Sequence, residues 1–142
     1  MHEVSLLMIH NKLPLQERLF RIQLSPDPYC SVCPSAIIQN VSHYFINCDR
    51  VQQYWIWVKR LCIKILEVDD VDDEALLKFY WPGSKRERGV SWLISQYIFI
   101  LWDMLAKRKL HQVNAGEFFG FLRFKYKEAL ALQTVSVLSD LR

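Results

Sequence analysis

Three cysteines and a histidine crowd between positions 30 and 48, in the pattern Cys30-x2-Cys33-x9-His43-x4-Cys48. Zinc takes four tetrahedral nitrogen or sulfur ligands, and a Cys-x2-Cys turn places two sulfurs on one side of the ion. His43 and Cys48 lie five residues apart, a spacing that a short helix or its frayed end can deliver. We therefore predict one structural zinc ion bound by Cys30, Cys33, His43 and Cys48, in a closed site that contributes to folding itself.

The alternative reading of this cluster is a set of unlinked buried cysteines beside a surface histidine. The crowding of the four residues in a loop flanked by prolines favours the metal. The remaining cysteine, Cys62, falls on an apolar helical face, where we expect core packing. His2, His10 and His111 have no partners at ligand spacing, and we expect them at the surface.

The cellular compartment bears on what the cysteines do. The stretch from Met1 to Met8 lacks the basic region and the small-residue cleavage site of a signal peptide. We expect an intracellular protein, in the nucleus or the cytoplasm. Thiols stay reduced there, which favours metal binding over disulfides.

The composition predicts an all-α fold, a small helical domain nucleated by the Cys-Cys-His-Cys zinc site. Four Gly and five Pro in 142 residues are few for a turn-rich β-sandwich, and a 51% hydrophobic content fits a globular core. We divide the chain into a zinc-binding helical half, 1–68, and a second helical half, 69–142. We expect the two halves to pack as one unit.

Apolar spacing and capping signals predict where the helices lie. The first expected helix covers 13–22, with Pro14 in its first turn and Leu15, Leu19 and Ile22 on one apolar face. Longer helices are expected over 50–66 and 86–110, and a short one from the cap Asp72 through Tyr80. A last helix should follow the Asn114-x-x-Glu117 capping signal.

The most apolar stretch runs from Val90 to Trp102. It is shorter than the ~20 residues that a membrane span needs, and Ser91, Ser95 and Gln96 interrupt it. We expect a buried helix and no membrane association. A helix that is apolar on nearly all sides must be covered by its neighbours or by a partner.

The ligand spacing excludes two common nucleic-acid-binding zinc modules. A retroviral-type knuckle has four residues between its second cysteine and its histidine, and this chain has nine. A two-Cys, two-His finger needs a second histidine after a recognition helix, and none follows here.

The residues around the predicted site also carry a family pattern. The segment Leu13-Pro14-Leu15-Gln16-Glu17-Arg18-Leu19 matches a Leu-Pro-x-x-x-Arg-Leu lead-in, and His43-Tyr44-Phe45-Ile46-Asn47-Cys48 matches His-x-Phe-x-x-Cys. Trp55 follows seven residues after the last cysteine. Together these motifs resemble the zinc-binding region that follows reverse transcriptase in LINE-type (non-LTR) retrotransposons. The resemblance is firm over 13–58 and looser over 85–108.

The resemblance implies a zinc-dependent module that helps to bind element RNA or target DNA. The chain has no Tyr-x-Asp-Asp motif and no room for a polymerase or an endonuclease, so the family's catalytic activities do not carry over. No nucleophile-base pair and no Gly-rich phosphate loop occurs at motif spacing, and we predict no enzymatic activity. An excised piece of such a protein and a domesticated descendant both fit.

Nucleic-acid binding would have to use local patches, because the formal charge of +3 is a weak field. The predicted phosphate contacts are Lys59, Arg60, Lys64, Lys85, Arg86, Arg88, Lys107, Arg108 and Lys109, and a further cluster is Arg123, Lys125 and Lys127. The alternative interpretation of each cluster is a solvated helix face with no binding role. Tyr44 and Phe45 could stack on bases, although beside a zinc site such rings more often pack in the core.

The runner-up function is a domesticated protein-protein interaction adapter. It would use the apolar helix around Val90–Trp102 to bind a partner chain or a second copy of itself. Steep loss of binding with added salt would favour nucleic acid, and salt-insensitive association would favour protein.

Overall fold

The computed structural model describes residues 12–78 and 84–131, and in these ranges the regular structure is helical. Tyr29 and Ile38 add one isolated antiparallel bridge. The elements are α2 (Gln16–Arg21), η1 (His43–Asn47), α3 (Gln52–Leu66), α4 (Asp73–Leu77), α5 (Lys85–Leu101), η2 (Trp102–Lys107) and α6 (Ala115–Ala131), where η marks a π-helical turn. The predicted all-α fold is confirmed.

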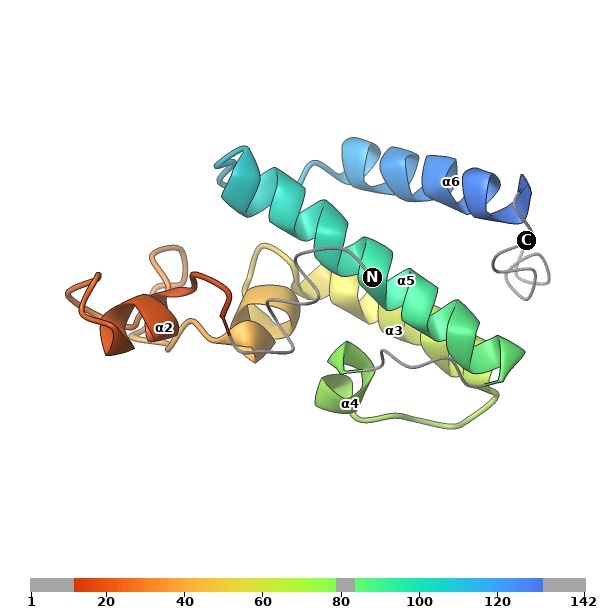
Figure 1. The fold of residues 1–142 in the computed structure, drawn as a ribbon, viewed down its shortest axis with the longest axis horizontal. Coiled ribbons are helices and arrows are strands. Elements are labelled where there is room, and N and C mark those ends of the chain that lie inside the picture. Colours follow the sequence, from red (N-terminus) through yellow and green to blue (C-terminus); the bar gives the residue numbers. More distant parts are fainter. Residues whose placement is uncertain (1–11, 79–83, 132–142) are drawn as a thin grey trace.

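Three long helices form the body of the molecule. α5 crosses α3 on one side and packs against α6 on the other (Figure 1). The centre of the core is aromatic: the ring of Tyr97 lies 5.4 Å from Trp55 of α3 and 6.1 Å from Phe118 of α6. Burying each such ring contributes on the order of 2–3 kcal/mol, so these two contacts help to hold the three helices together.

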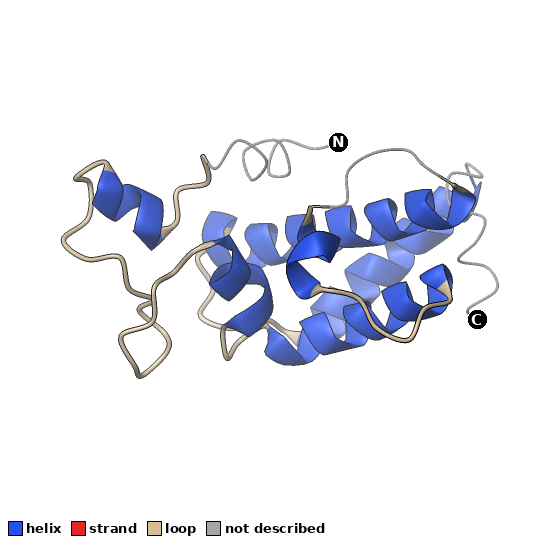
Figure 2. Cartoon of the chain, turned by 90° about the horizontal axis from the view of Figure 1, so that it is seen from below, coloured by secondary structure: helices blue, strands red, loops and turns tan. Residues whose placement is uncertain are grey.

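The segment from residue 12 to the start of η1 forms a separate lobe at one end of the three-helix body (Figures 1 and 2). It is mostly loop and contains α2. We call this segment, with η1 and Cys48, the cysteine lobe. The boundary predicted at residue 68 stays a prediction, and buried side chains from both sides of it belong to one hydrophobic cluster.

The sequence pattern of α3 is confirmed by its burial. Five residues of the predicted 50–66 helix recur at helical spacing and are all at most 2% exposed: Val51, Trp55, Val58, Cys62 and Ile65. The helix ends at Glu67, whose left-handed backbone (φ 57°) is the conformation that usually closes a helix.

α5 is buried as predicted, with eight of its residues inside the domain. By length and composition alone, the continuous helix Lys85–Lys107, of 23 residues, could cross a membrane. However, 56% of its apolar window is buried against the rest of the domain, and core helices pass the same test. The apolar side chains of Val90–Trp102 are therefore largely covered by α3 and α6.

The prediction for the first helix is wrong in two respects. α2 begins at Gln16 rather than at residue 13, so Pro14 precedes the helix. Leu15 is buried ahead of it, whereas Ile22 is 46% exposed, and no residue within α2 is buried. Six residues make fewer than two helical turns, which is too short for a continuous apolar face. The limits of so short a helix are set mainly by tertiary packing.

The predicted caps are present. Asp72 accepts a 3.1 Å hydrogen bond from the Ala75 amide at the start of α4, and Asn114 accepts one of 2.8 Å from the Glu117 amide in α6. α4 ends at Leu77, and residues 79–83, into which the prediction extended, lie outside the described residues, as do His2 and His10.

Candidate metal centre

The four predicted ligands converge in the structure. One donor atom from each of Cys30, Cys33, His43 and Cys48 lies within 4.8 Å of the others, and all four residues are buried. The sulfur of Cys48 is 4.0 Å from that of Cys30 and 3.8 Å from that of Cys33. The Nε2 atom of His43 lies 3.4 Å from the sulfur of Cys33.

These distances fit one tetrahedral ion. At ordinary zinc bond lengths, the edges of such a tetrahedron are roughly 3.8 Å between two sulfurs and roughly 3.6 Å between sulfur and nitrogen. The three observed distances lie within a few tenths of an ångström of these values. The four side chains therefore form a buried group that can hold a metal ion.

The first two ligands sit on a loop whose ends are paired. The amide of Cys30 donates to the carbonyl of Ile37 at 2.8 Å, and the amide of Gln39 donates to the carbonyl of Pro28 at 2.9 Å. These bonds close the Cys30–Cys33 loop like a short hairpin. Gln39 also accepts from the amide of Gln16, which fixes the loop against the start of α2.

His43 and Cys48 are delivered by the π-helical turn η1. Residues five apart on an α-helix point about 140° away from each other, which would separate the two ligands. In η1 the amide of Cys48 donates to the carbonyl of His43 at 2.8 Å, the i to i+5 bond of a π-turn. The wider turn brings Cys48 back beside His43. Asn40 starts this turn by accepting the His43 amide at 2.9 Å.

The surroundings of Cys30 and Cys33 shift the pKa values of these two thiols in opposite directions. Burial and the neighbouring sulfur of Cys48 together raise the pKa of Cys33 to about 11, although a backbone hydrogen bond from Asp49 opposes them. Burial also raises the pKa of Cys30, but hydrogen bonds from the amides of Cys33 and Val32 outweigh it and leave the pKa below the ordinary 9.0. A divalent cation among three such thiols would favour their thiolate forms.

The histidine is set up to ligate through a neutral ring. Burial lowers the pKa of His43, the charge of Arg50 lowers it further, and Asp49 opposes both effects. A lowered pKa keeps the imidazole unprotonated at neutral pH, which is the state that a metal ligand requires.

Aromatic side chains within η1 anchor the metal turn to the core. Phe45 is fully buried, and its carbonyl accepts a 2.6 Å hydrogen bond from the hydroxyl of Tyr97. The ring centroids of Tyr44 and Trp102 lie 5.8 Å apart. The guanidinium of Arg50 lies over the Tyr44 ring, 5.7 Å from its centroid. Tyr44 and Phe45 are therefore core residues rather than open stacking platforms.

Three of the nine predicted phosphate contacts are neutralised by carboxylates. Lys59 pairs with Asp73 at 2.8 Å and with Asp70 at 3.4 Å. Arg86 pairs with Glu67 at 3.0 Å and donates to the carbonyl of Ile65 at the end of α3.

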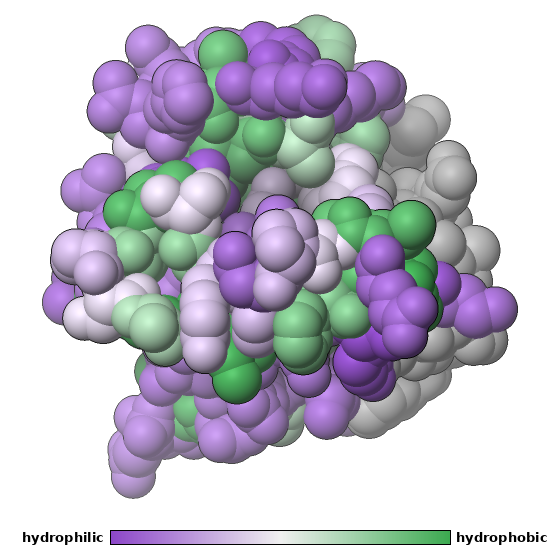
Figure 3. Space-filling view, turned by 90° about the vertical axis from the view of Figure 1, so that its left-hand side faces the viewer, coloured by the Kyte–Doolittle hydropathy of each residue, from purple (hydrophilic) through white to green (hydrophobic). Residues whose placement is uncertain are grey.

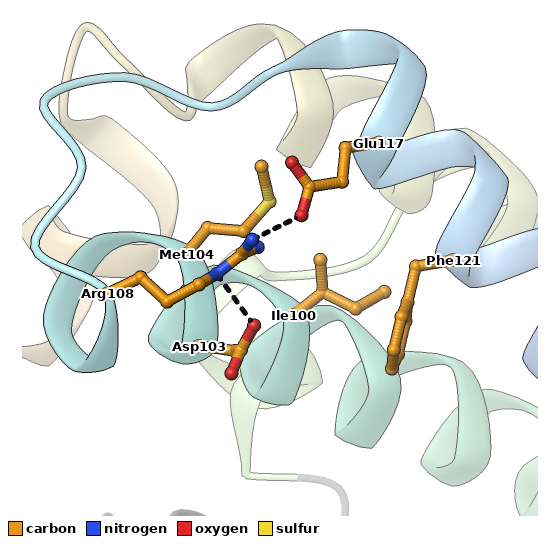
Figure 4. Close-up of a pocket in the computed structure, with 6 residues that line it drawn as sticks. All are labelled: Ile100, Asp103, Met104, Arg108, Glu117 and Phe121. Atoms are coloured by element: carbon orange, nitrogen blue, oxygen red, sulfur yellow. Dashed lines mark ion pairs between the residues drawn. The ribbon is translucent and has the colours of Figure 1, made fainter.

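Arg108 is the third, and it lies at a cavity of about 230 Å³ between the η2 end of the long helix and α6. Its guanidinium bridges Asp103 and Glu117 (Figure 4). The paired charges make this cavity a packing feature of the fold.

The other six predicted contacts stay available. In residues 12–78 and 84–131, these side chains are exposed and make no ion pair: Arg60, Lys64, Lys85, Arg88, Lys107 and Lys109. Of the further cluster, Lys125 lies 3.9 Å from Glu128, while Arg123 and Lys127 are exposed without an ion pair among the described residues.

Two residues that support the candidate metal centre, Asn40 and Tyr97, were not predicted from the sequence. Asn40 precedes its turn by the spacing of an N-cap, so a capping search would have found it. Tyr97 lies 52 residues from the carbonyl that it binds, and no local pattern marks that contact.

The chain was compared with protein-family models, with curated proteins and with solved structures, and none of them matches it.

Proposed function

We propose that this chain is a zinc-stabilised, non-catalytic module that binds nucleic acid, akin to the region that follows reverse transcriptase in LINE-type elements. The observation that carries the nucleic-acid proposal is the set of six exposed cations without a carboxylate partner in the described ranges, Arg60, Lys64, Lys85, Arg88, Lys107 and Lys109. Unpaired cations release condensed counterions when they meet phosphates, which drives binding.

Zinc is the metal that the donor set supports best. Three thiolates and one imidazole are soft-to-borderline ligands, and a tetrahedral sulfur-nitrogen set is typical of zinc. Four protein ligands fill the coordination sphere, so no position is left for a reactive water. This closure supports a structural ion and a non-catalytic chain.

Part of the family pattern falls on residues that the fold buries. Leu13 and Trp55 are each 2% exposed, and Phe45 is fully buried. His43 and Cys48 are candidate ligands. In the same pattern Pro14 is exposed, and Arg18 and Leu19 are half-buried. The buried positions support the proposal that the pattern belongs to one folded module.

Two measurements on one purified sample test the proposal. Elemental analysis should give about one zinc per chain. The affinity for labelled RNA or DNA should fall linearly on a log–log plot against salt, with a slope that reports the number of phosphate contacts. Absence of zinc, or no detectable binding at low salt, would contradict the corresponding half of the proposal.

Protein interaction is the second candidate, and one observation favours it. Seven of the twelve exposed large hydrophobic side chains in the described residues lie on the cysteine lobe: Phe20, Ile22, Leu24, Tyr29, Val32, Ile37 and Ile38. Figure 3 views this end of the molecule and shows hydrophobic surface among polar side chains. An adapter would use this lobe, because the helix around Val90–Trp102 is mostly covered. Salt-insensitive association would support it.

A further inference from the structure

The outward side of α3 carries a row of four exposed side chains, Gln53, Trp57, Arg60 and Lys64, which we call the α3 stripe. They follow one another at steps of four, three and four residues. On a helix this places them within about 60° of arc and along roughly 16 Å of its length. They therefore form one continuous strip of surface.

The charge of the stripe is not compensated. α3 contains no Asp or Glu between Gln52 and Leu66. Lys59, on another side of the helix, is held by Asp73 and Asp70. Arg60 and Lys64 make no ion pair with any residue in the described ranges. The acidic segment after α3 thus neutralises one cation of the helix and leaves the two in the stripe open.

The tryptophan of the stripe is held in place while part of it faces solvent. Trp57 is 38% exposed, and its ring meets Phe119 of α6 edge-to-face, with centroids 4.9 Å apart and planes at 77°. Arg123 follows Phe119 by one helical turn, so it extends the positive charge from α6 on the same side. A ring fixed by a neighbour loses little conformational freedom when it binds a ligand.

We infer that the α3 stripe, flanked by Phe119 and Arg123, binds single-stranded nucleic acid, with an unpaired base on Trp57 and phosphates at Arg60 and Lys64. The inference rests on the proposed function and names its site. A base offers its flat face to an aromatic ring only when it is unpaired, and base-aromatic stacking tolerates any sequence. Two cations along the same strip match the charge of a strand that carries one phosphate per base.

The test measures binding of the zinc-loaded chain to a labelled unstructured polyuridylate and to an RNA duplex of the same length. Trp57→Leu keeps an apolar contact with Phe119 but removes the stacking ring, so affinity for the single strand should fall about 5- to 10-fold, the low end of the stacking range. Arg60→Gln with Lys64→Gln should lower the log–log salt slope by about 1.4.

Matched variants keep the result specific. Phe124→Leu removes an aromatic ring that is 62% exposed on the opposite flank of α6, and it should leave affinity unchanged. Arg21→Gln with Lys78→Gln removes the same charge from two exposed positions outside the proposed set of binding cations and should change the slope less. Helical circular dichroism confirms that each variant is folded, and the double glutamine variant serves if Trp57→Leu is not.

Two outcomes separate the inference from the proposed function. If the chain binds the single strand but the stripe variants match their controls, or if the duplex binds as tightly, the stripe is not the site, while nucleic-acid binding stands. If the unchanged chain binds neither probe at low salt, both the inference and the proposed function are overturned.

Discussion

The hydroxyl of Tyr97 donates a 2.6 Å hydrogen bond to the backbone carbonyl of Phe45. Tyr97 lies in the middle of the core helix α5, and Phe45 lies within the π-turn, two residues after the candidate ligand His43. Both side chains are fully buried. Burial raises the pKa of Tyr97 well above its ordinary value, so the hydroxyl keeps its proton and remains a donor. The bond couples the metal turn to the helical core.

Removal of this hydroxyl should weaken both the fold and the metal site. Tyr97→Phe leaves the Phe45 carbonyl buried without its donor, which should lower the free energy of unfolding by about 1–3 kcal/mol. Because that carbonyl belongs to the turn that delivers His43 and Cys48, metal affinity should also fall. Urea unfolding and competition with a chromophoric chelator measure the two effects.

Tyr54→Phe is the matched control for Tyr97→Phe. It removes a buried hydroxyl that donates to the Val113 carbonyl at 3.1 Å, next to α6 and away from the ligands. It should cost similar stability and leave metal affinity unchanged. Equal metal affinity in both variants would show that Tyr97 contributes to the core alone.

Chelation should unfold the cysteine lobe and spare most of the helical body. α2 has no buried residue, and between residue 16 and the start of η1 the only buried apolar side chains of the described chain are the candidate ligands Cys30 and Cys33, so the metal is the main constraint on this part of the lobe. The aromatic contacts of Trp55, Tyr97 and Phe118 do not involve a ligand. Amide exchange should accelerate across 12–48 and stay slow in the centres of α3 and α5. Uniform loss of protection would show that the metal supports the whole fold.

Cys62 should resist alkylation under conditions that modify the other cysteines. It is fully buried, and burial raises its pKa to about 12. At pH 8, below that pKa, about one thiol in ten thousand is the reactive thiolate, and raising the pH toward 12 increases reactivity. Mass spectrometry after chelation and iodoacetamide should find Cys30, Cys33 and Cys48 modified first. Equal labelling of Cys62 would mean that the core opens with the lobe.

Substitution separates ligands from packing residues. Cys48→Ser should abolish stoichiometric zinc binding, because it removes a sulfur that contacts the other two at 4.0 and 3.8 Å. Cys62→Ala should keep one zinc per chain and lower stability by about 1 kcal/mol through lost apolar burial. Elemental analysis of both purified variants measures their zinc content. If Cys48→Ser retained one zinc per chain, Cys48 would not be a ligand.

Features that depend on neighbours in the chain could be predicted from sequence. The ligand cluster follows from the spacing between Cys30 and Cys48, and the inward face of α3 follows from a 3.6-residue period. Asp72 and Asn114 cap helices because a cap bonds only to an amide two or three residues away. The length of α2 was misjudged, since a six-residue helix takes its limits from tertiary contacts such as that with Gln39.

The sequence by itself determined the all-α class, the four residues that converge and the inward face of α3, because these depend on local spacing and periodicity. Only the tertiary structure decided which cations stay free. Lys59, Arg86 and Arg108 are neutralised by Asp73, Glu67 and Glu117, which lie nine or more residues away along the chain. The structure also decided the link from Tyr97 to the metal turn. Such contacts form between distant segments brought together by burial of the core, and no local pattern encodes them.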